Sequence, residues 1–416
     1  MRRVLAAIVI PLVVVTLVAM AIMWPRNSTE RRRLSGPSPS RSLIAAKVTN
    51  VDRDRCTSDY QVDSGTAYCD QVSIRLANGN PAEFEHPSAN GFSINKGDDI
   101  YVDAFTVASA NNSEKTVYSF YEFKRERPLL ALLVVFIVVA VAVGRVKGLR
   151  ALIALAISLV VLGAFILPAI AAGQSPLLVA LVGSSVVMFL ALYFSHGVNV
   201  RTTSAVIGTI ASLAITGALA TISVSAARFT GLAGEETSYL RATSAGIDLR
   251  GLLLAGIIIG ALGVLDDVTI TQSSAVWELH QANPSLGFAG VYNAALRIGR
   301  DHIASAVNTL VLAYAGASLP LLLLFTQVGT PFGELFNGEP VATEVVRMLA
   351  GSIGLMASVP ITTALTALVV RTDRGPSAPP LSSTAPGRPR RRLRSSPSRT
   401  FVRPSSEREF RDGFDN

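Results

Sequence analysis

Eight apolar runs, most of them about as long as a bilayer-spanning helix, constrain this chain more than any other feature. A helix needs roughly 20 apolar residues to cross the hydrocarbon core of a membrane. Half of the 416 residues are hydrophobic and only 16% are charged, which is typical of multi-span membrane proteins. The sequence predicts an α-helical polytopic membrane protein with about eight transmembrane helices, at residues 4–24, 129–143, 151–171, 177–195, 203–223, 251–271, 304–326 and 346–370.

Lys and Arg in the short connections predict the orientation of these helices, because basic residues are retained on the cytoplasmic side. With the N-terminus inside, the inner connections carry Arg145, Lys147, Arg150, Arg201, Arg297 and Arg300. The opposite connections are neutral, mixed or acidic, and the last of them contains Glu334, Glu339 and Glu344. Eight spans place both termini in the cytoplasm.

The first run has two interpretations. Residues 1–24 form a retained membrane anchor, or they form a cleaved signal peptide, since Arg2 and Arg3 precede the run and Ala19-Met20-Ala21 resembles a cleavage site. The apolar run is longer than a usual signal core, which favours the anchor. Residues 25–40 then form a Ser/Pro/Arg-rich linker, and residues 41–127 lie outside in either case.

Residues 41–127 alternate apolar and polar side chains between turn signals, a pattern typical of strands. The runs LIAAKVTNV, DQVSIRL, DDIYVDAF and TVYSFYEF are separated by ANGNP, NKGD and ASANNS, and they indicate about five strands. We expect an external β-rich domain, a small barrel like an OB-fold, between the first and second membrane helices.

The only two cysteines, Cys56 and Cys69, both lie in this external segment. An oxidising location permits a disulfide bond between them, which would contribute about 3 kcal/mol by closing a short loop. The alternative is two free thiols. A metal site is not indicated, because structural zinc needs about four ligands and His86 is the nearest imidazole.

Residues 128–370 form a seven-helix membrane domain, and the composition changes completely after it. Residues 371–416 are rich in Arg, Ser and Pro, so they bury too little apolar surface to order themselves. We expect a disordered cytoplasmic tail whose basic cluster lies on anionic lipid headgroups. Nucleic-acid binding is the other interpretation of this cluster, and we do not favour it. The cluster comprises Arg388, Arg390, Arg391, Arg392 and Arg394.

Asp266 and Asp267 lie side by side within the sixth apolar run. One charge at the centre of a membrane helix costs roughly 2.5–3.5 kcal/mol on insertion scales, so carboxylates found there usually face a bundle interior or a wet cavity and mark ion or proton pathways. The alternative is that the helix ends at Leu265 and the two carboxylates are boundary charges.

Helical spacing connects this pair to other polar residues. Asp267, Thr271, Ser274 and Glu278 share one face of the sixth helix if it continues that far, and Asp301, Ser305, Asn308 and Thr309 form a stripe on the seventh. We expect the two stripes to meet inside the bundle and to form an ion- or proton-coupling site. The alternative is that the hydroxyl and amide groups only make interhelical hydrogen bonds.

Between these two helices, Asn283-Pro284 breaks the chain, and residues 285–300 are expected to form a short amphipathic helix on the inner membrane surface. That helix would bring Arg300 near the base of the seventh span. A contact of Arg297 or Arg300 with a carboxylate would keep that carboxylate ionised, whereas two neighbouring carboxylates without such a partner would share a proton.

The runs GALGVLDDVTITQSSAVWEL and GRDHIASAVNTLVLAYAGASLPLLLLF resemble the signature of the YibE/F-like family of bacterial membrane proteins. The resemblance extends through most of residues 41–370 and implies a multi-pass protein of the bacterial cell membrane. A weaker similarity to RND-type permeases and Sec accessory proteins implies proton coupling through acidic residues, with Arg300, Asn308 and Thr309 in the comparable place. The chain lacks the two large external domains of the bigger permeases.

Two functions follow from these features. The first is a secondary, ion- or proton-coupled permease or export factor of unknown substrate that uses Asp266, Asp267, Glu278 and Asp301. The second is a non-transporting assembly or envelope-interaction scaffold that acts through its external domain on an unknown protein partner, and either permits a homo-oligomer. An enzyme is not indicated and no cofactor is expected, because the sequence contains neither a His-Glu-x-x-His zinc motif nor a phosphate-binding P-loop.

Overall fold

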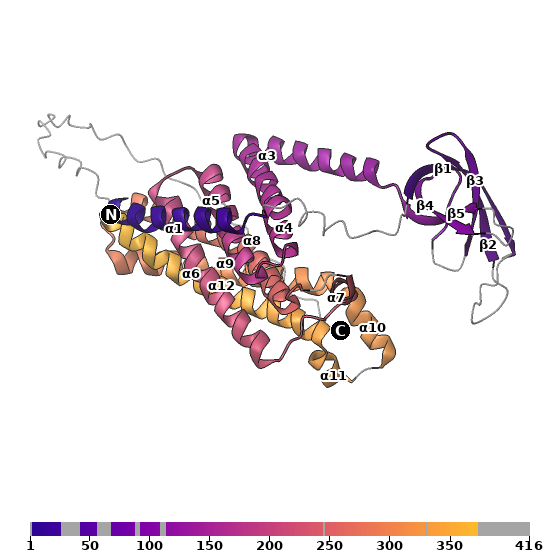
Figure 1. Cartoon of the computed structure of the whole chain (residues 1–416). Helices are drawn as coiled ribbons and strands as arrows, with labels where there is room; N and C mark the ends of the chain where they lie inside the picture. Colours follow the sequence, from indigo (N-terminus) through magenta and orange to yellow (C-terminus); the bar gives the residue numbers. More distant parts are fainter. Residues whose placement is uncertain are drawn as a thin grey trace, which may run out of the picture. The chain divides into compact units, whose positions relative to one another are not determined.

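The computed structural model describes residues 2–25, 42–55, 68–87, 92–108, 114–243, 246–329 and 331–372. The strands are β1 (Ser42–Arg55), β2 (Tyr68–Leu76), β3 (Pro81–Pro87), β4 (Asp99–Ala108) and β5 (Glu114–Phe123). The helices are α1 (Arg2–Met23), α3 (Glu126–Val161), the π-helical turn η1 (Leu162–Ile166), α4 (Leu167–Ala171), α5 (Pro176–His196), α6 (Val200–Ala226), α7 (Glu235–Thr243), α8 (Leu249–Ala282), α9 (Phe288–Ala317), α10 (Leu319–Val328), α11 (Phe332–Asn337) and α12 (Glu339–Thr372) (Figure 1).

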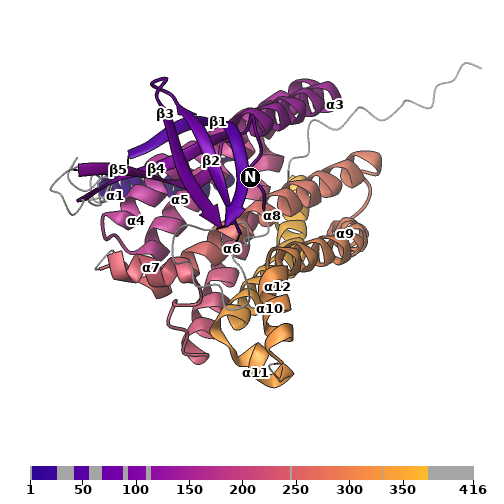
Figure 2. The same ribbon diagram turned by 90° about the vertical axis from the view of Figure 1, so that its right-hand side faces the viewer.

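The five strands form one antiparallel sheet in the order β3-β2-β1-β4-β5. β1, β2 and β3 can be followed side by side in Figure 2. β3 also contacts β5, so the two edges of the sheet approach each other and the sheet curls into a nearly closed small barrel. The expected barrel of about five strands is confirmed at this level.

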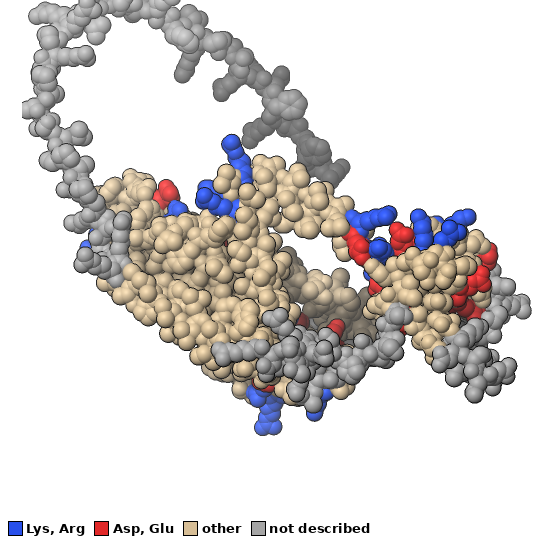
Figure 3. Space-filling model, turned by 45° about the horizontal axis from the view of Figure 1, so that its top comes forward, with Lys and Arg blue, Asp and Glu red and all other residues tan. Residues whose placement is uncertain are grey.

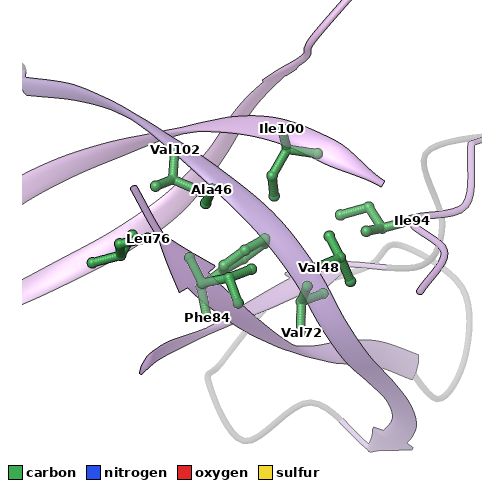
Figure 4. Close-up of a cluster of buried hydrophobic side chains, with 9 residues drawn as sticks. Ala46, Val48, Val72, Leu76, Phe84, Ile94, Ile100 and Val102 are labelled. Carbon is green, nitrogen blue, oxygen red and sulfur yellow. The ribbon is translucent and has the colours of Figure 1, made fainter. Parts of the chain in front are cut away.

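The period of two along each strand explains the core of the barrel. Successive side chains of a strand point to opposite faces, and alternate residues of β2 and β4, such as Val72 with Ile74 and Ile100 with Val102, are fully buried. Figure 4 shows Val72, Ile100 and Val102 gathered with Phe84 of β3 in the interior. This apolar cluster holds the sheet in its curled form.

Cys69 of β2 is buried and disulfide-bonded. Cys56, the only other cysteine of the sequence, lies outside the described residues, as do most of the expected linker and the C-terminal tail from residue 373 onward. The basic cluster expected to contact lipid headgroups therefore also lies outside them.

α3 is two helical segments joined at Arg145. The backbone there is not helical (φ 49°, ψ −131°), and the chain reverses so tightly that a side chain at Gly148 would collide with the carbonyl group of Ala140. With η1 and α4, the segment Glu126–Ala171 spans 46 residues. Two of the eight expected runs, 129–143 and 151–171, therefore lie in this one helical segment, which reverses at Arg145, and the loop expected at Gly144 to Arg150 is mostly helical.

Six helices in the described part of the chain are long and apolar enough to cross a membrane, and α9 with α10 makes a seventh if this pair, bent by 57°, is one span. The bend falls at Ser318, where the seventh expected run is interrupted. Figure 3 shows that the visible flank of the helices carries few charged side chains, whereas the barrel carries many. The chain is thus mostly helical, with several helices suited to a bilayer.

The core of the helical bundle is formed by α6, α8 and α12, each of which contacts the other two. α5 and α9 pack against α8 as well, and α1 packs against α5 and α6. Directly after α1, the Trp24 ring stacks on Phe165 of η1 with 5.8 Å between ring centroids. α8 is consequently surrounded by protein over most of its length.

One end of the bundle, called the basic end below, is where α5, α8 and α12 finish and α6 and α9 begin. Contacts define it: Ser273 donates to the Arg201 carbonyl, and Val276 packs with Val291 and Val370. The basic side chains of Lys147, Arg150, Arg201, Arg297, Arg300 and Arg371 belong to the segments that meet there.

The expected separate amphipathic helix at residues 285–300 is wrong. α9 runs without a break from Phe288 to Ala317, and the expected interruption at Asn283-Pro284 is the only gap between α8 and α9. Val291 and Ala295 are buried against α8 and α12 instead of resting on lipid. Further along α9, a side chain at Gly299 would collide with Val359 of α12 and Gln272 of α8, so the small residue allows this close approach.

Candidate functional site

Asp266 and Asp267 lie at the middle of α8. The helix continues to Ala282, so it does not end at Leu265. Asp266 is half-buried, and the side chain of Asp267 is exposed on the flank of the bundle. Both carboxylates therefore lie well inside a long, largely apolar helix and not at its boundary.

The two carboxylates line a pocket of about 420 Å³ between α3, α5 and α8. Most of its walls are aliphatic side chains of these three helices and of η1. Its polar lining residues are Ser158 of α3, Ser184, Ser195 and His196 of α5, and the aspartates of α8. The arrangement is an apolar groove with a carboxylate pair on one wall.

The pocket runs inward from the basic end. On α5 its lining extends from His196, the last residue of the helix, to Ser184, which is about 18 Å along the helix axis. Ser184 is only 1% exposed, and its Oγ has no hydrogen-bond partner among the described residues. A buried hydroxyl without a partner costs about 1–3 kcal/mol, so the deep end of the pocket holds an unsatisfied polar group.

The backbone beside the carboxylates is tied to a neighbouring helix. Thr269 Oγ1 lies 3.1 Å from the Asp266 carbonyl oxygen, to which it donates, and 2.6 Å from Thr209 Oγ1 of α6. Both threonines are fully buried. The turn of α8 that carries the carboxylates is thus tied to α6 through these two hydroxyls.

The mouth of the pocket is polar and partly cationic. His196 interacts electrostatically with Asp267, Arg201 and Lys147. Asn199 fixes the connection between α5 and α6. Its amide Nδ2 donates to the His196 carbonyl (2.8 Å), and its Oδ1 accepts from the Thr202 backbone N–H (2.9 Å). A charged group that enters the pocket here therefore passes the basic side chains at the mouth first and reaches the acidic side chains after them.

The other predicted site residues do not join the pocket. Glu278, Thr271, Asp301, Arg300, Ser305, Asn308 and Thr309 are exposed, and none of them lines it. The hydroxyls of Ser274 and Thr309 donate to carbonyl groups of their own helices, those of Ile270 and Ser305. α9 presents the opposite face, with Ala295, Gly299 and Leu310, to its neighbours. The structure does not bring the two expected polar stripes together.

Polar contacts do cross the bundle, through residues that the sequence pattern had not singled out. Gln272 Nε2 donates to Thr363 Oγ1 of α12 (2.7 Å) and to the Ala295 carbonyl of α9 (2.9 Å). Thr366 donates to Ser273, 3.2 Å away. We call the buried set Thr209, Thr269, Gln272, Ser273, Thr363 and Thr366 the hydroxyl seam. The density of Ser and Thr in residues 202–216 and 358–366 is the signal that could have indicated it.

A second charged group lies towards the opposite end of the bundle, on α12. Arg347 forms an ion pair with Glu344 (2.8 Å), and its guanidinium lies over the Tyr314 ring of α9, 6.0 Å from the centroid. Each partner of the ion pair keeps about a quarter of its side chain exposed, with 27% for both. The two charges of this pair compensate each other.

Within the described ranges, no group of three or more His, Cys, Asp or Glu side chains is arranged to hold a metal ion. The pocket offers two carboxylates on one helix turn, one imidazole at the mouth and scattered hydroxyls. Such a set suits the binding and release of protons or of a cation that brings its own apolar surface.

Comparison with known proteins gives one match. A family model described as YibE/F-like protein matches residues 132–372, which include the pocket and the hydroxyl seam but not the barrel. No curated protein and no solved structure matches the chain.

Proposed function

The chain belongs to the YibE/F-like family, and from that premise we propose that it is a membrane transport protein, a secondary permease or export factor coupled to protons or other cations. The observation that carries the proposal is the position of Asp266 and Asp267 at the centre of α8, where they line the pocket. Carboxylates at such a depth are costly and are associated with ion and proton pathways.

The proposed mechanism uses the pocket as the place where charge enters the bundle. The two adjacent carboxylates are the proposed place where the coupling ion is held and released. Binding a cation neutralises them, and releasing it restores a charge that the surrounding bilayer disfavours. The free energy of the occupied pocket therefore differs from that of the empty one, which is the requirement for coupling an ion to a conformational change.

We propose that the basic end faces the cytoplasm, in accordance with the retention of basic residues on that side. Both termini then lie inside, the barrel lies outside, and the protein belongs to the bacterial cell membrane. The packing of Leu5 and Val9 of α1 into the bundle supports a retained anchor. Placing the basic tail beside anionic headgroups follows from the same orientation. An enzymatic role is not part of the proposal.

The test is ion flux in proteoliposomes that contain the full chain. A potassium diffusion potential is imposed and internal pH is followed with a trapped dye, with sodium and potassium exchange measured in parallel. We expect protein-dependent flux that Asp266→Asn with Asp267→Asn abolishes. Asp301→Asn is the matched control, since it removes a carboxylate that does not line the pocket. Flux that persists in the double variant would remove the proposal.

A scaffold that acts through the barrel is the second candidate. The observation in its favour is the exposure of aromatic side chains on the barrel, Phe92 (38%), Phe105 (43%) and Tyr121 (50%), which suits contact with a partner protein. Removing residues 41–127 separates the two candidates. Transport predicts that the shortened chain keeps its flux and that the double Asp variant loses it, whereas the scaffold predicts no ion flux in any form of the chain.

A further inference from the structure

We infer that the pocket between α3, α5 and α8 binds an amphipathic organic cation, with its positive group beside Asp266 and Asp267 and its apolar body along the aliphatic walls. The inference deepens the proposed function and rests on it for the role of the site in transport. The binding itself requires only the geometry of the pocket.

The charge of the pocket selects the sign of the ligand. Asp266 and Asp267 are its acidic lining residues, and in the described part of the chain neither lysine nor arginine lines it. The basic residues near His196 lie at the mouth, outside the lining. A cation therefore has a favourable partner inside the pocket, and an anion has none.

The size and the walls select the body of the ligand. The volume of about 420 Å³ is in the range of sites for small organic molecules, roughly 300–1,000 Å³. Leu155, Leu162, Val187 and Leu262 contribute aliphatic surface. A bare inorganic cation would leave that surface uncovered, and it would find no cluster of three His, Cys, Asp or Glu ligands within the described residues.

Ser184 gives the ligand a second polar group. Its Oγ is buried at the deep end of the pocket, with no partner in the part of the chain that the structure describes, and neighbouring residues of α5 pack there against Ile259 of α8. Ile259 is two turns of α8 from Asp266, or about 10 Å. A ligand that satisfies both positions has a cationic group and a hydrogen-bonding group at opposite ends of an apolar body about that long.

Three probes test these statements by equilibrium binding to the purified full chain in nanodiscs, with empty nanodiscs subtracted. They are phenylbutylammonium, the neutral phenylbutanol of the same shape, and phenylbutylammonium with a para-hydroxyl group on the ring. We expect wild-type protein to bind the ammonium at least about tenfold more tightly than the alcohol. The hydroxylated ammonium is expected to bind more tightly still.

Substitutions assign each effect to a residue. Asp266→Asn with Asp267→Asn should reduce the preference for ammonium over alcohol to less than about threefold, while Asp301→Asn leaves it unchanged. Ser184→Ala should remove only the gain from the para-hydroxyl group, about three- to tenfold. Size-exclusion profiles and tryptophan fluorescence show whether each variant is folded. Because Ser184→Ala retains both aspartates, it should still prefer ammonium over alcohol, which serves as an internal check.

The outcomes separate this inference from the proposed function. Equal binding of ammonium and alcohol by wild-type protein would overturn the inference and show an apolar groove that accepts lipid chains. If ion flux still depends on the aspartates, transport stands with another substrate. Selective ammonium binding without any ion flux would retain the ligand class and overturn transport.

Discussion

Gln272 illustrates how much of this protein depends on single buried polar side chains. Its amide connects α8 to both α9 and α12 and is only 3% exposed. Inside a membrane such hydrogen bonds contribute modestly, about 0.6 kcal/mol on average and at most about 1.7. Because Gln272 makes two such hydrogen bonds, its contribution to the packing of the three helices should be large enough to measure.

We predict that Gln272→Leu lowers the free energy of unfolding by about 1–2 kcal/mol, because the Ala295 carbonyl and the Thr363 hydroxyl lose their donor. The measurement is unfolding by sodium dodecyl sulfate in mixed micelles. Gln281→Leu, an exposed glutamine near the end of the same helix, should be close to neutral. Equal effects of the two substitutions would contradict the assigned role of Gln272.

The protonation of His86 is expected to make the stability of the barrel depend on pH. Burial lowers the pKa of His86 below its usual value, and the carboxylate of Asp70 opposes this shift more weakly. Its ring contacts Phe92 and Phe120, with centroids 5.0 and 5.4 Å away. The folded barrel therefore favours the neutral imidazole.

In the unfolded chain His86 takes up a proton near pH 6.5, whereas in the folded barrel it does so only at lower pH. Its contribution to stability is therefore intact above about pH 6.5 and is lost as the pH falls towards the folded-state pKa. We expect hydrogen exchange of β3 amides, corrected for the intrinsic rate, to quicken between pH 7.5 and 5.5. His86→Phe should weaken this dependence; an unaltered dependence would assign it to other groups.

At the scale of the elements, close packing of α6 and α12 decides how the bundle core assembles. A side chain at Gly208 would collide with Thr362, and one at Gly354 would collide with the hydroxyl of Thr216. Small residues at these crossings let the helix backbones approach. The same closeness places the buried hydroxyls of the two helices on either side of α8.

Gly208→Ala and Gly354→Ala are each predicted to destabilise the bundle by about 1–3 kcal/mol, because the added methyl group forces the threonine or the backbone to move. Gly316→Ala is the control, since nothing lies within 4 Å of a side chain at that position in α9. The control should be neutral or slightly stabilising through higher helix propensity. Thermal unfolding in detergent distinguishes them, and a neutral Gly354→Ala would contradict the packing.

At the scale of the whole molecule, the proposed orientation makes the barrel and the α3 reversal accessible from opposite sides of the membrane. Asn78, in the β2–β3 turn, is exposed, and Lys147 lies at the basic end. We predict that Asn78→Cys reacts with a membrane-impermeant maleimide in intact cells, whereas Lys147→Cys reacts only after permeabilisation. The reverse pattern would invert the orientation and require the pocket to open outward.

Local signals were sufficient for the division of the chain into a small barrel and a set of long apolar helices. Alternation with a period of two acts over a few residues, so the strands that contain Val72 and Val102 could be predicted without knowing their partners. The break at Asn283-Pro284 is equally local. β3 was not among the quoted runs, because its sequence, PAEFEHP, is short and flanked by prolines.

Local signals could not predict which polar residues contact one another in the folded bundle. α8 is apolar all round over residues 251–265, so helical spacing defines its faces but not which neighbouring helix each face meets. The expected partners on α9, Asp301 and Asn308, are exposed, and the carboxylates instead line a pocket with α3 and α5.

The sequence by itself determined the class of the molecule, its division into a strand-rich segment and long apolar helices, and the presence of two carboxylates inside one of those helices. These properties depend on the chemistry of consecutive residues. Only the tertiary structure decided that Ser184 and His196 share a pocket with Asp266, and that Thr209 and Gln272 belong to the interior. Those relations depend on how each helix is rotated about its own axis, and that rotation results from packing against elements far away along the chain.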